Sequence, residues 1–265
     1  MYHQKIGIKK LSQFDQIAFF WIGNDILIPT YLVKSINLVY NRKVKIFHLT
    51  NFITKKIPGT TKTIRLDLSK DIMIARIQAY KNFTYNKNLT FFCDADSLFI
   101  QQLNLFDLKQ DMYFVKRSEN FIMNHMWPEY YPEFVNKNAI DLMPYLFGAM
   151  AFRNGKNFFT ELLDTCLNLP ERFHRWYGDQ YSLAINLKKN GEKLNLLPIE
   201  LYLKIVRKPI IKEDLNLYFN KNVKLITFKG ENSKKFIHES YINLVNFSNY
   251  YDFPYNNNWR IDKTN

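Results

Sequence analysis

The chain contains little cysteine and no long apolar segment. Only two of its 265 residues are cysteines, Cys93 and Cys166. We interpret both as reduced apolar side chains, because they lie in a predicted strand and a predicted helix and form no disulfide or metal-binding pattern. The longest unbroken apolar run, Ile17–Ile22, has six residues, far short of the roughly 20 that span a bilayer. Because the first residues also lack a signal-peptide pattern, we expect a cytoplasmic protein.

Patterns typical of nucleic-acid-binding proteins are absent as well. The chain has 37 Lys and Arg against 24 Asp and Glu, a formal net charge of +13. This charge could attract nucleic acid, an anionic membrane surface or an acidic substrate such as a nucleotide diphosphate. However, the lysines are spread along the chain, and no zinc-finger spacing, RNP signature or clear helix-turn-helix is visible. We therefore expect no specific nucleic-acid partner, while peripheral contact with the inner face of a membrane stays open.

The residues that are present favour one α/β domain. With 47% hydrophobic residues the chain can bury a substantial core, and no repeat or low-complexity linker divides it, so we treat 1–265 as a single domain. Apolar patterns predict strands at 16–23, 44–49, 63–66, 89–93, 112–115, 146–153, 194–197 and 224–228, and helices at 29–40, 71–83, 155–167 and 179–188. Such alternation is typical of a three-layer, Rossmann-like architecture around a mostly parallel sheet.

Two carboxylates follow the predicted strand at 89–93. Asp94 and Asp96 form a D-x-D pattern at its C-terminal edge, where α/β proteins place their chemistry. Residues two apart in a strand point to the same side, and in the turn after the strand both acids can approach one divalent cation. Oxygen-only ligation favours Mg²⁺ or Mn²⁺. Because D-x-D is common by chance, the buried strand before it is what makes this pattern informative.

An acid, an amide and a cation from other parts of the chain could converge on Asp94 and Asp96. Asp179 and Gln180 begin a predicted helix, where Asp179 either caps the helix or faces a ligand. Arg76 lies on the helix before the Asp94 strand. It could reach a phosphate or orient a carboxylate, and an ordinary surface position is equally compatible with the sequence.

A glycine turn follows the last predicted strand. Lys229 and Gly230 stand at the end of this strand, and Lys234 and Lys235 come shortly after. Backbone N–H groups and lysines at such a turn suit a diphosphate, although solvated lysines explain the same pattern.

The least regular part of the chain is the stretch at 118–145, which we expect to overhang the carboxylate edge. Long irregular insertions in compact domains are usually functional. Its aromatic residues, Trp127, Tyr130, Tyr131 and Phe134, offer flat faces to sugar rings. Packing of the segment onto the domain is the interpretation that we favour for them.

In their order along the chain, these segments resemble the nucleotide-sugar-dependent glycosyltransferases of the GT-A fold, particularly bacterial cell-surface glycan enzymes and the glycogenin-like families. The likeness covers about residues 16–237. It rests on Trp21-Ile22-Gly23-Asn24, Ala75-Arg76, Phe92-Cys93-Asp94-Ala95-Asp96, Phe147-Gly148-Ala149-Met150, Asp179-Gln180 and Phe228-Lys229-Gly230. The resemblance implies a nucleotide-binding half at 16–117, an acceptor, lid and closing half at 118–237, and a C-terminal tail at 238–265.

The same resemblance implies an enzyme that moves a sugar from a nucleotide-diphosphate sugar, with UDP as the expected nucleotide, to a saccharide or lipid-linked acceptor, as in polysaccharide biosynthesis. In such enzymes the two acids of the D-x-D hold Mn²⁺ or Mg²⁺ on the donor diphosphate, which carries over to Asp94 and Asp96. Gly148 would let the backbone approach the sugar, and Asp179 and Gln180 would line the donor-sugar and acceptor pocket as catalytic residues. The expected donor-binding residues are Ile22, Gly23, Asn24, Arg76, Asp94, Ala95, Asp96, Gly148, Lys229, Gly230 and Lys234.

One position departs from the family pattern. Many glycogenin-like relatives begin the last motif with a histidine that is a third metal ligand, whereas Thr227 stands here. The threonine could bind the metal through water, or His238 could take its place. Alternatively, Asp94, Asp96 and the diphosphate could suffice, as substrate phosphates often complete the shell of Mg²⁺.

Two rival functions come from other classes. Phosphatases of the haloacid-dehalogenase type also have a strand that ends in D-x-D, but near the start of their domain and with a late acidic pair. Here βα units precede Asp94, and Leu183 stands four residues after Asp179, where the second late acid would be. A non-catalytic binder of nucleic acid or anionic surfaces would explain the charge but not the ordered motifs.

Overall fold

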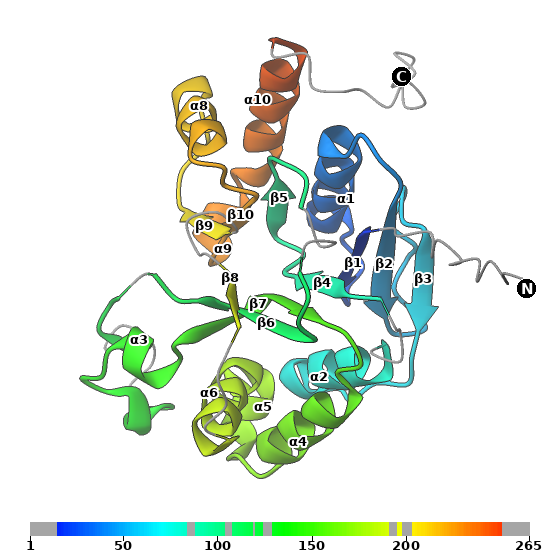
Figure 1. The fold of residues 1–265 in the computed structure, drawn as a ribbon. Helices are drawn as coiled ribbons and strands as arrows, with labels where there is room; N and C mark the ends of the chain where they lie inside the picture. The colour runs from blue at the N-terminus through cyan, green and yellow to red at the C-terminus, as the bar shows by residue number, and fades with distance from the viewer. Residues whose placement is uncertain are drawn as a thin grey trace, which may run out of the picture.

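The computed structural model describes residues 15–83, 88–103, 108–118, 120–123, 129–190, 195–197 and 203–250 (Figure 1). Its main sheet has seven strands in the order β3-β2-β1-β4-β7-β6-β8. The strands are β1 (Asp15–Phe20), β2 (Val44–Thr50), β3 (Lys62–Arg65), β4 (Thr90–Cys93), β6 (Met112–Lys116), β7 (Tyr145–Phe152) and β8 (Leu196–Leu197). Only β7 runs antiparallel to its neighbours, so the predicted α/β fold with a mostly parallel central sheet is confirmed.

Helices cover both faces of this sheet because its strands bury side chains on both sides. Ile17, Phe19 and Phe91 point to the face covered by α1 (Leu27–Val39). Ala18 and Phe92 point to the opposite face, against α2 (Ile72–Phe83), α4 (Lys156–Leu167) and α6 (Gly178–Asn190). Successive strand residues alternate between the faces, which explains why the buried strands have near-continuous apolar sequences. The result is the predicted three-layer arrangement (Figure 1).

A second, three-stranded sheet stands beside the first and was not expected from the sequence. Its order is β5 (Ser97–Phe99), β10 (Leu225–Phe228) and β9 (Leu203–Val206), with β10 antiparallel to β5 and parallel to β9. It packs with α8 (Lys212–Asn220), and α9 (Glu231–Lys234) follows β10 directly. Because β5 begins at the residue directly after the D-x-D and pairs with β10, the last strand is brought next to the two acids.

Residues 238–250, the first part of the predicted C-terminal tail, belong to helix α10 (Ile237–Tyr250). This helix packs against α1, where the rings of Tyr31 and Tyr241 lie 5.3 Å apart between centroids. Within the part of the chain that the structure describes, no helix combines the length and the apolar character that crossing a bilayer requires.

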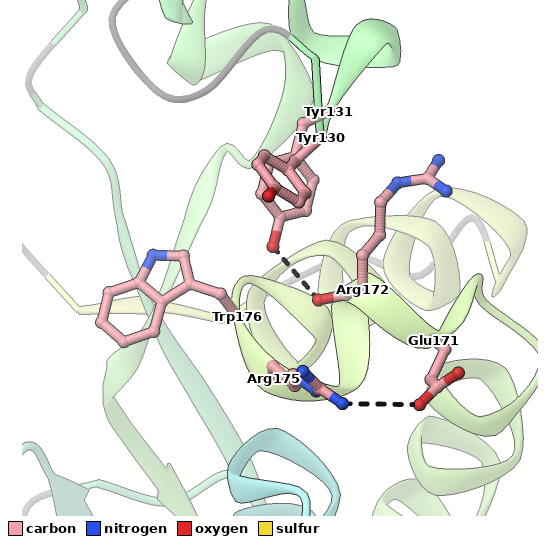
Figure 2. Close-up of a pocket in the computed structure, with 6 residues that line it drawn as sticks. All are labelled: Tyr130, Tyr131, Glu171, Arg172, Arg175 and Trp176. Atoms are coloured by element: carbon pink, nitrogen blue, oxygen red, sulfur yellow. Dashed lines mark hydrogen bonds and ion pairs between the residues drawn. The ribbon is translucent and has the colours of Figure 1, made fainter.

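The irregular segment packs onto the domain through Tyr131 and Phe134, as predicted, whereas Tyr130 is exposed. The segment contains the short helices η3 (Pro132–Phe134) and α3 (Ala139–Leu142). Tyr131 and Phe134 are buried against Phe173 of α5 (Glu171–Arg175). The Tyr131 hydroxyl also donates to the Arg172 carbonyl oxygen at 3.1 Å (Figure 2). Trp127 was also predicted to offer a face to sugar rings. It lies outside the described residues.

Candidate functional site

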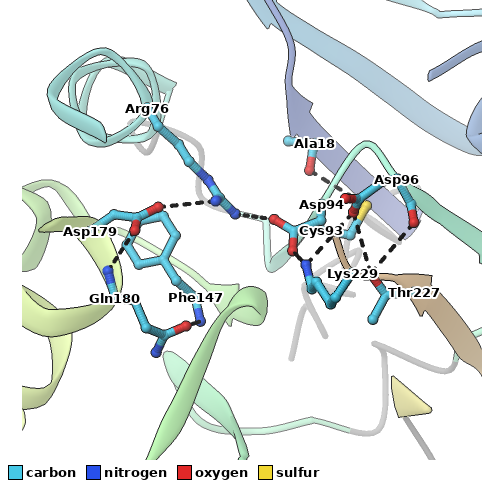
Figure 3. Close-up of polar contacts among 10 residues, drawn as sticks. All are labelled: Ala18, Arg76, Cys93, Asp94, Asp96, Phe147, Asp179, Gln180, Thr227 and Lys229. Carbon is cyan, nitrogen blue, oxygen red and sulfur yellow. Dashed lines mark hydrogen bonds and ion pairs between the residues drawn. The ribbon is translucent and has the colours of Figure 1, made fainter. Parts of the chain in front are cut away.

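The two acids of the D-x-D lie in the turn that joins the two sheets. β4 ends at Cys93 and β5 begins at Ser97, so Asp94 and Asp96 belong to the connection, while Ala95 between them is buried in the core. The ammonium of Lys229 contacts Asp94 Oδ2 and lies 3.7 Å from Asp96 Oδ1 (Figure 3). The two carboxylates therefore approach a common point from which one cation can reach both.

Arg76 connects this turn to helix α6. Its Nη2 donates to Asp94 Oδ1, and its Nη1 donates to Asp179 Oδ2 at 3.0 Å (Figure 3). The guanidinium lies 4.6 Å from the centroid of the Phe147 ring, and only 16% of the side chain is exposed. A planar guanidinium holds its partners in fixed directions. Of the three possibilities that the sequence left open for Arg76, the contacts and burial show the orientation of carboxylates, while contact with a phosphate stays a prediction.

Burial raises the pKa values of Asp94, Asp96 and Asp179, whereas the positive charges nearby lower them. Burial alone raises the pKa of Asp94, but the positive charges of Arg76 and Lys229 outweigh it and hold the pKa of this carboxyl well below its usual range. At Asp96 and Asp179 burial is the stronger influence, and the pKa of each carboxyl is raised. Asp94 is thus the acid whose ionised form the two cations stabilise most.

Strand β7 approaches the D-x-D turn at Gly148. The pairing of β6 with β7 changes register across residues 147–149, and the Asp94 N–H donates to the Gly148 carbonyl oxygen at 3.1 Å. A Cβ at position 148 would lie 2.8 Å from Asp94 Oδ1 and closer still to Oδ2. The space that the glycine leaves is therefore filled by the Asp94 carboxylate. The approach of a sugar to this backbone, implied by the resemblance, stays a prediction.

The side chains at the start of α6 lie next to this irregular part of β7, which we call the bulge. The Phe147 N–H donates to Gln180 Oε1 at 3.0 Å, and Gln180 Nε2 donates to the Tyr145 carbonyl oxygen. Asp179 Oδ1 accepts the N–H of Gln180 at 2.6 Å while its Oδ2 binds Arg76. Gln180 thus supplies hydrogen bonds to the part of β7 where pairing with β6 is interrupted. Asp179 accepts the N–H of Gln180 in the first turn of α6 and also binds Arg76.

The turn after β10 brings the last predicted motif to the acids. Thr227 pairs with Ser97 of β5, and its hydroxyl donates to Asp96 Oδ1 at 3.3 Å. Gly230 follows Lys229 with φ of +80°, a left-handed conformation that favours glycine. Lys234, at the end of α9, pairs with Glu231 at 3.1 Å. The glycine turn and its first lysine are therefore next to the D-x-D.

The loop after β1 lies at the same sheet edge, because β1 and β4 are parallel neighbours. Ile22 packs against the core face that α2 covers, Asn24 is exposed, and the Gly23 N–H donates to Thr54 Oγ1 at 3.2 Å. This position is compatible with the donor-binding role that the resemblance implies for 22–24.

The donor set fits a divalent cation of the magnesium or manganese class. Asp94 and Asp96 already share the Lys229 ammonium, and carboxylate oxygens are the ligands that these ions prefer. Among the described residues no group of three His, Cys, Asp or Glu side chains gathers in a metal-binding arrangement. His238, one candidate for the third ligand, is instead hydrogen-bonded through Nδ1 to the Tyr31 hydroxyl. The protein would therefore hold the ion through Asp94 and Asp96, with Thr227 beside Asp96.

A cavity of about 720 Å³ opens next to α5. Its lining residues are Tyr130, Tyr131, Glu171, Arg172, Arg175 and Trp176 (Figure 2). Tyr130 and Trp176 are 59% and 46% exposed. Tyr177 has φ of +65° and turns the chain between α5 and α6, so Trp176 lines the cavity while Asp179, three residues on, binds Arg76. Sequence analysis missed the α5 residues of this cavity, because a five-residue helix shows no apolar periodicity.

The fold matches that of glycosyltransferases of known structure. The glycosyltransferase GlyE of Streptococcus pneumoniae TIGR4 aligns with a TM-score of 0.53 at 14% identity, over 94% of this chain and 66% of GlyE. Its apo-form structure gives 0.52 at 15% identity, over 91% of this chain and 63% of GlyE, so the chain spans just under two thirds of that protein. A glycosyltransferase involved in glycosylation of the major capsid of PBCV-1 aligns with a TM-score of 0.54 at 9% identity, over 86% of this chain and 99% of the other. No protein-family model and no curated protein sequence matches the chain. The protein thus has a glycosyltransferase fold.

Proposed function

We propose that the protein transfers a sugar from a nucleotide-diphosphate sugar, with UDP as the first nucleotide to test, to a saccharide or lipid-linked acceptor. One observation carries the proposal: in a glycosyltransferase fold, Arg76 holds Asp94 and Asp179 while Lys229 bridges Asp94 and Asp96. These side chains come from α2, the β4–β5 turn, α6 and the turn after β10. Four separate segments thus supply a cluster of alternating charge at the carboxyl end of a parallel strand, where α/β proteins bind ligands.

The charges suit the chemistry of glycosyl transfer. As the sugar leaves with oxocarbenium character, negative charge develops on the nucleotide diphosphate. Lys229 and Lys234 lie at the turn where the resemblance places this diphosphate, and cations there stabilise the leaving group. Arg76 keeps Asp94 and Asp179 in place. A divalent ion held by Asp94 and Asp96 supplies Lewis-acid neutralisation of the diphosphate when bound.

The cavity beside α5 supports a role for this region in binding the acceptor. Its volume is in the range of about 300–1,000 Å³ typical of ligand pockets. The exposed rings of Tyr130 and Trp176 offer apolar faces to sugar rings, and the nearby guanidinium of Arg175 offers donors to hydroxyl or anionic groups. The net charge of +13 favours an acceptor that is anionic or presented at an anionic membrane surface. The protein would then work on the inner face of that membrane.

Calorimetry of UDP binding in the presence of Mn²⁺ or Mg²⁺ tests the donor site, and hydrolysis of a panel of nucleotide sugars identifies the donor. We expect UDP to bind with the metal and to lose at least about tenfold in affinity with a chelator or in Asp96→Asn, because one carboxylate ligand is removed. Asp164→Asn, an exposed acid on α4, is the matched control and should bind UDP as the wild type does. If no nucleotide diphosphate binds with either metal, the proposed function is wrong.

The acceptor region needs a separate test. Trp176→Ala should lower transfer to the acceptor while leaving UDP affinity and nucleotide-sugar hydrolysis unchanged, because Trp176 lines the cavity and the D-x-D is held by other residues. Equal loss of hydrolysis and transfer would place Trp176 in the donor site instead.

A further inference from the structure

Lys229 occupies a position that a metal ion would also need. Its ammonium contacts Asp94 Oδ2 and lies 3.7 Å from Asp96 Oδ1, so it bridges both acids of the D-x-D (Figure 3). An ion of the Mg²⁺ or Mn²⁺ class binds carboxylate oxygens at about 2.0–2.2 Å. An ion bound by the same two carboxylates would therefore lie within a few ångströms of the ammonium. Two cations at that separation repel each other strongly, and more so where water is largely excluded.

The two cations that already contact Asp94 differ in how firmly they are held. Arg76 is 16% exposed, pairs with a second acid, Asp179, and packs over the Phe147 ring. Lys229 is 38% exposed and reaches the acids on a flexible four-carbon stem. It precedes Gly230, where an added Cβ would meet no described atom within 4 Å. The Lys229 ammonium is thus less confined than the Arg76 guanidinium, and it is the cation that can leave the acids more readily.

A new partner for the ammonium is expected close by. The turn of Lys229 and Gly230 is where the proposed function places the donor diphosphate, so the lysine could exchange a carboxylate for a phosphate oxygen. Thr227, two residues earlier, stays on Asp96 through its hydroxyl and belongs to the paired part of β10. The strand therefore stays in place while the lysine side chain exchanges partners.

We propose that Lys229 competes internally with the divalent ion for Asp94 and Asp96, and that its ammonium moves from these carboxylates to the donor diphosphate when ion and nucleotide bind together. The inference rests on the proposed function for the phosphate partner of the lysine. It makes metal binding and nucleotide binding mutually supportive, because the nucleotide gives the displaced ammonium a partner and the ion takes over the acids. Metal binding to the protein alone should accordingly be weak.

The test compares Mn²⁺ binding to the purified full chain, followed by electron paramagnetic resonance of free Mn²⁺, with and without UDP. Lys229→Gln should bind Mn²⁺ about tenfold more tightly than the wild type when UDP is absent, because the charge-assisted contact that the ion must displace is gone. The same variant should bind UDP about tenfold more weakly with Mn²⁺ present. Lys229→Met, which keeps the length of the stem without the charge, should show the same shifts. Lys188→Gln, at an exposed lysine near the end of α6, is the matched control and should leave Mn²⁺ affinity without UDP within about twofold.

Each outcome separates this inference from the proposed function. If folded Lys229→Gln and Lys229→Met bind Mn²⁺ no more tightly than the wild type but still bind UDP, the proposed competition is wrong. The proposed donor site is not contradicted by that result. Tighter Mn²⁺ binding in both variants without UDP binding in any protein supports competition for the acids and overturns the proposed function. Absence of Mn²⁺ binding in the wild type and both variants overturns the competition. Melting temperatures by circular dichroism verify that the compared variants are folded.

Discussion

Gly148→Ala should displace Asp94 and is the most direct probe of the site's geometry. The new Cβ would lie 2.8 Å from Asp94 Oδ1 and closer to Oδ2, whereas ordinary contacts between nonbonded heavy atoms are about 3.5 Å or more. Gly148 does not have a positive φ, so alanine is compatible with the backbone of β7 itself. The whole effect should therefore come from moving the Asp94 carboxylate away from Arg76 and Lys229.

The magnitude follows from those two contacts. Separating a buried ion pair typically costs about 3–5 kcal/mol, whereas an exposed pair contributes about 1 kcal/mol or less. Asp94 and Arg76 are mostly buried and Lys229 is partly exposed, so we expect Gly148→Ala to lower the free energy of unfolding by about 2–3 kcal/mol. The same displacement should weaken UDP binding in the presence of metal, because Asp94 is a proposed ligand.

A double-mutant cycle measured by urea denaturation isolates the contact. Asp94→Ala removes the carboxylate that the new Cβ would meet, so adding Gly148→Ala in that background should cost less than about 0.5 kcal/mol. Gly230→Ala is the control: its φ of +80° and ψ of 156° are essentially restricted to glycine, so it should cost about 1–3 kcal/mol in either background, and no described atom crowds that position. If Gly148→Ala is equally destabilising with and without the Asp94 carboxylate, the placement of Asp94 over β7 is wrong.

Three further outcomes test other parts of the structure. Asp179→Asn should lower transfer much more than UDP affinity in calorimetry, because Asp179 touches Arg76 rather than the turn after β10; an equal loss of both would contradict this assignment. Gln180→Met should cost about 1–3 kcal/mol in urea denaturation, because it leaves the Phe147 N–H of the bulge without its acceptor, and a variant as stable as the wild type would argue against that bond. His48 is fully buried, and burial lowers its pKa from 6.5 to about 4. The unfolded chain therefore takes up this proton first as the pH falls, so the stability that neutral His48 contributes is complete above about pH 6.5 and declines by about 3 kcal/mol towards pH 4. His48→Gln should show a shallower decline over that interval, and parallel curves for the two proteins would refute the shift.

Elements with strong local patterns could be predicted from the sequence. Helices α1, α2, α4 and α6 fall within a few residues of their predicted bounds, because each runs for three or more turns and repeats apolar residues at helical spacing. The same holds for β4, whose four residues are all buried. Periodicity is a property of neighbouring residues, so it survives without knowledge of the tertiary structure.

Short elements could not be predicted in this way. β5 has three residues and follows the D-x-D so closely that it looks like a continuation of the apolar run before it. β9 has four residues and is defined mainly by pairing with β10, whose residues stand 22 positions later in the sequence. Neither has enough residues to show a period, and both depend on partners that only the folded chain supplies. For that reason the second sheet was missed although β10 was expected.

The polar partnerships of the site depend still more on tertiary structure. Sequence placed acids at the end of β4 and at the start of α6, since strand ends and helix starts have local signatures. It could not show that Arg76 joins Asp94 to Asp179, which is 103 residues from Arg76, or that Lys229 reaches back 135 residues to Asp94. These contacts arise because the D-x-D turn leaves the main sheet and enters the second sheet through β5, whose pairing with β10 brings Lys229 to the acids. A cation from outside the main sheet thus neutralises acids at its edge. This junction between sheets, rather than the D-x-D spacing, determines which charges the proposed nucleotide and metal would have to displace.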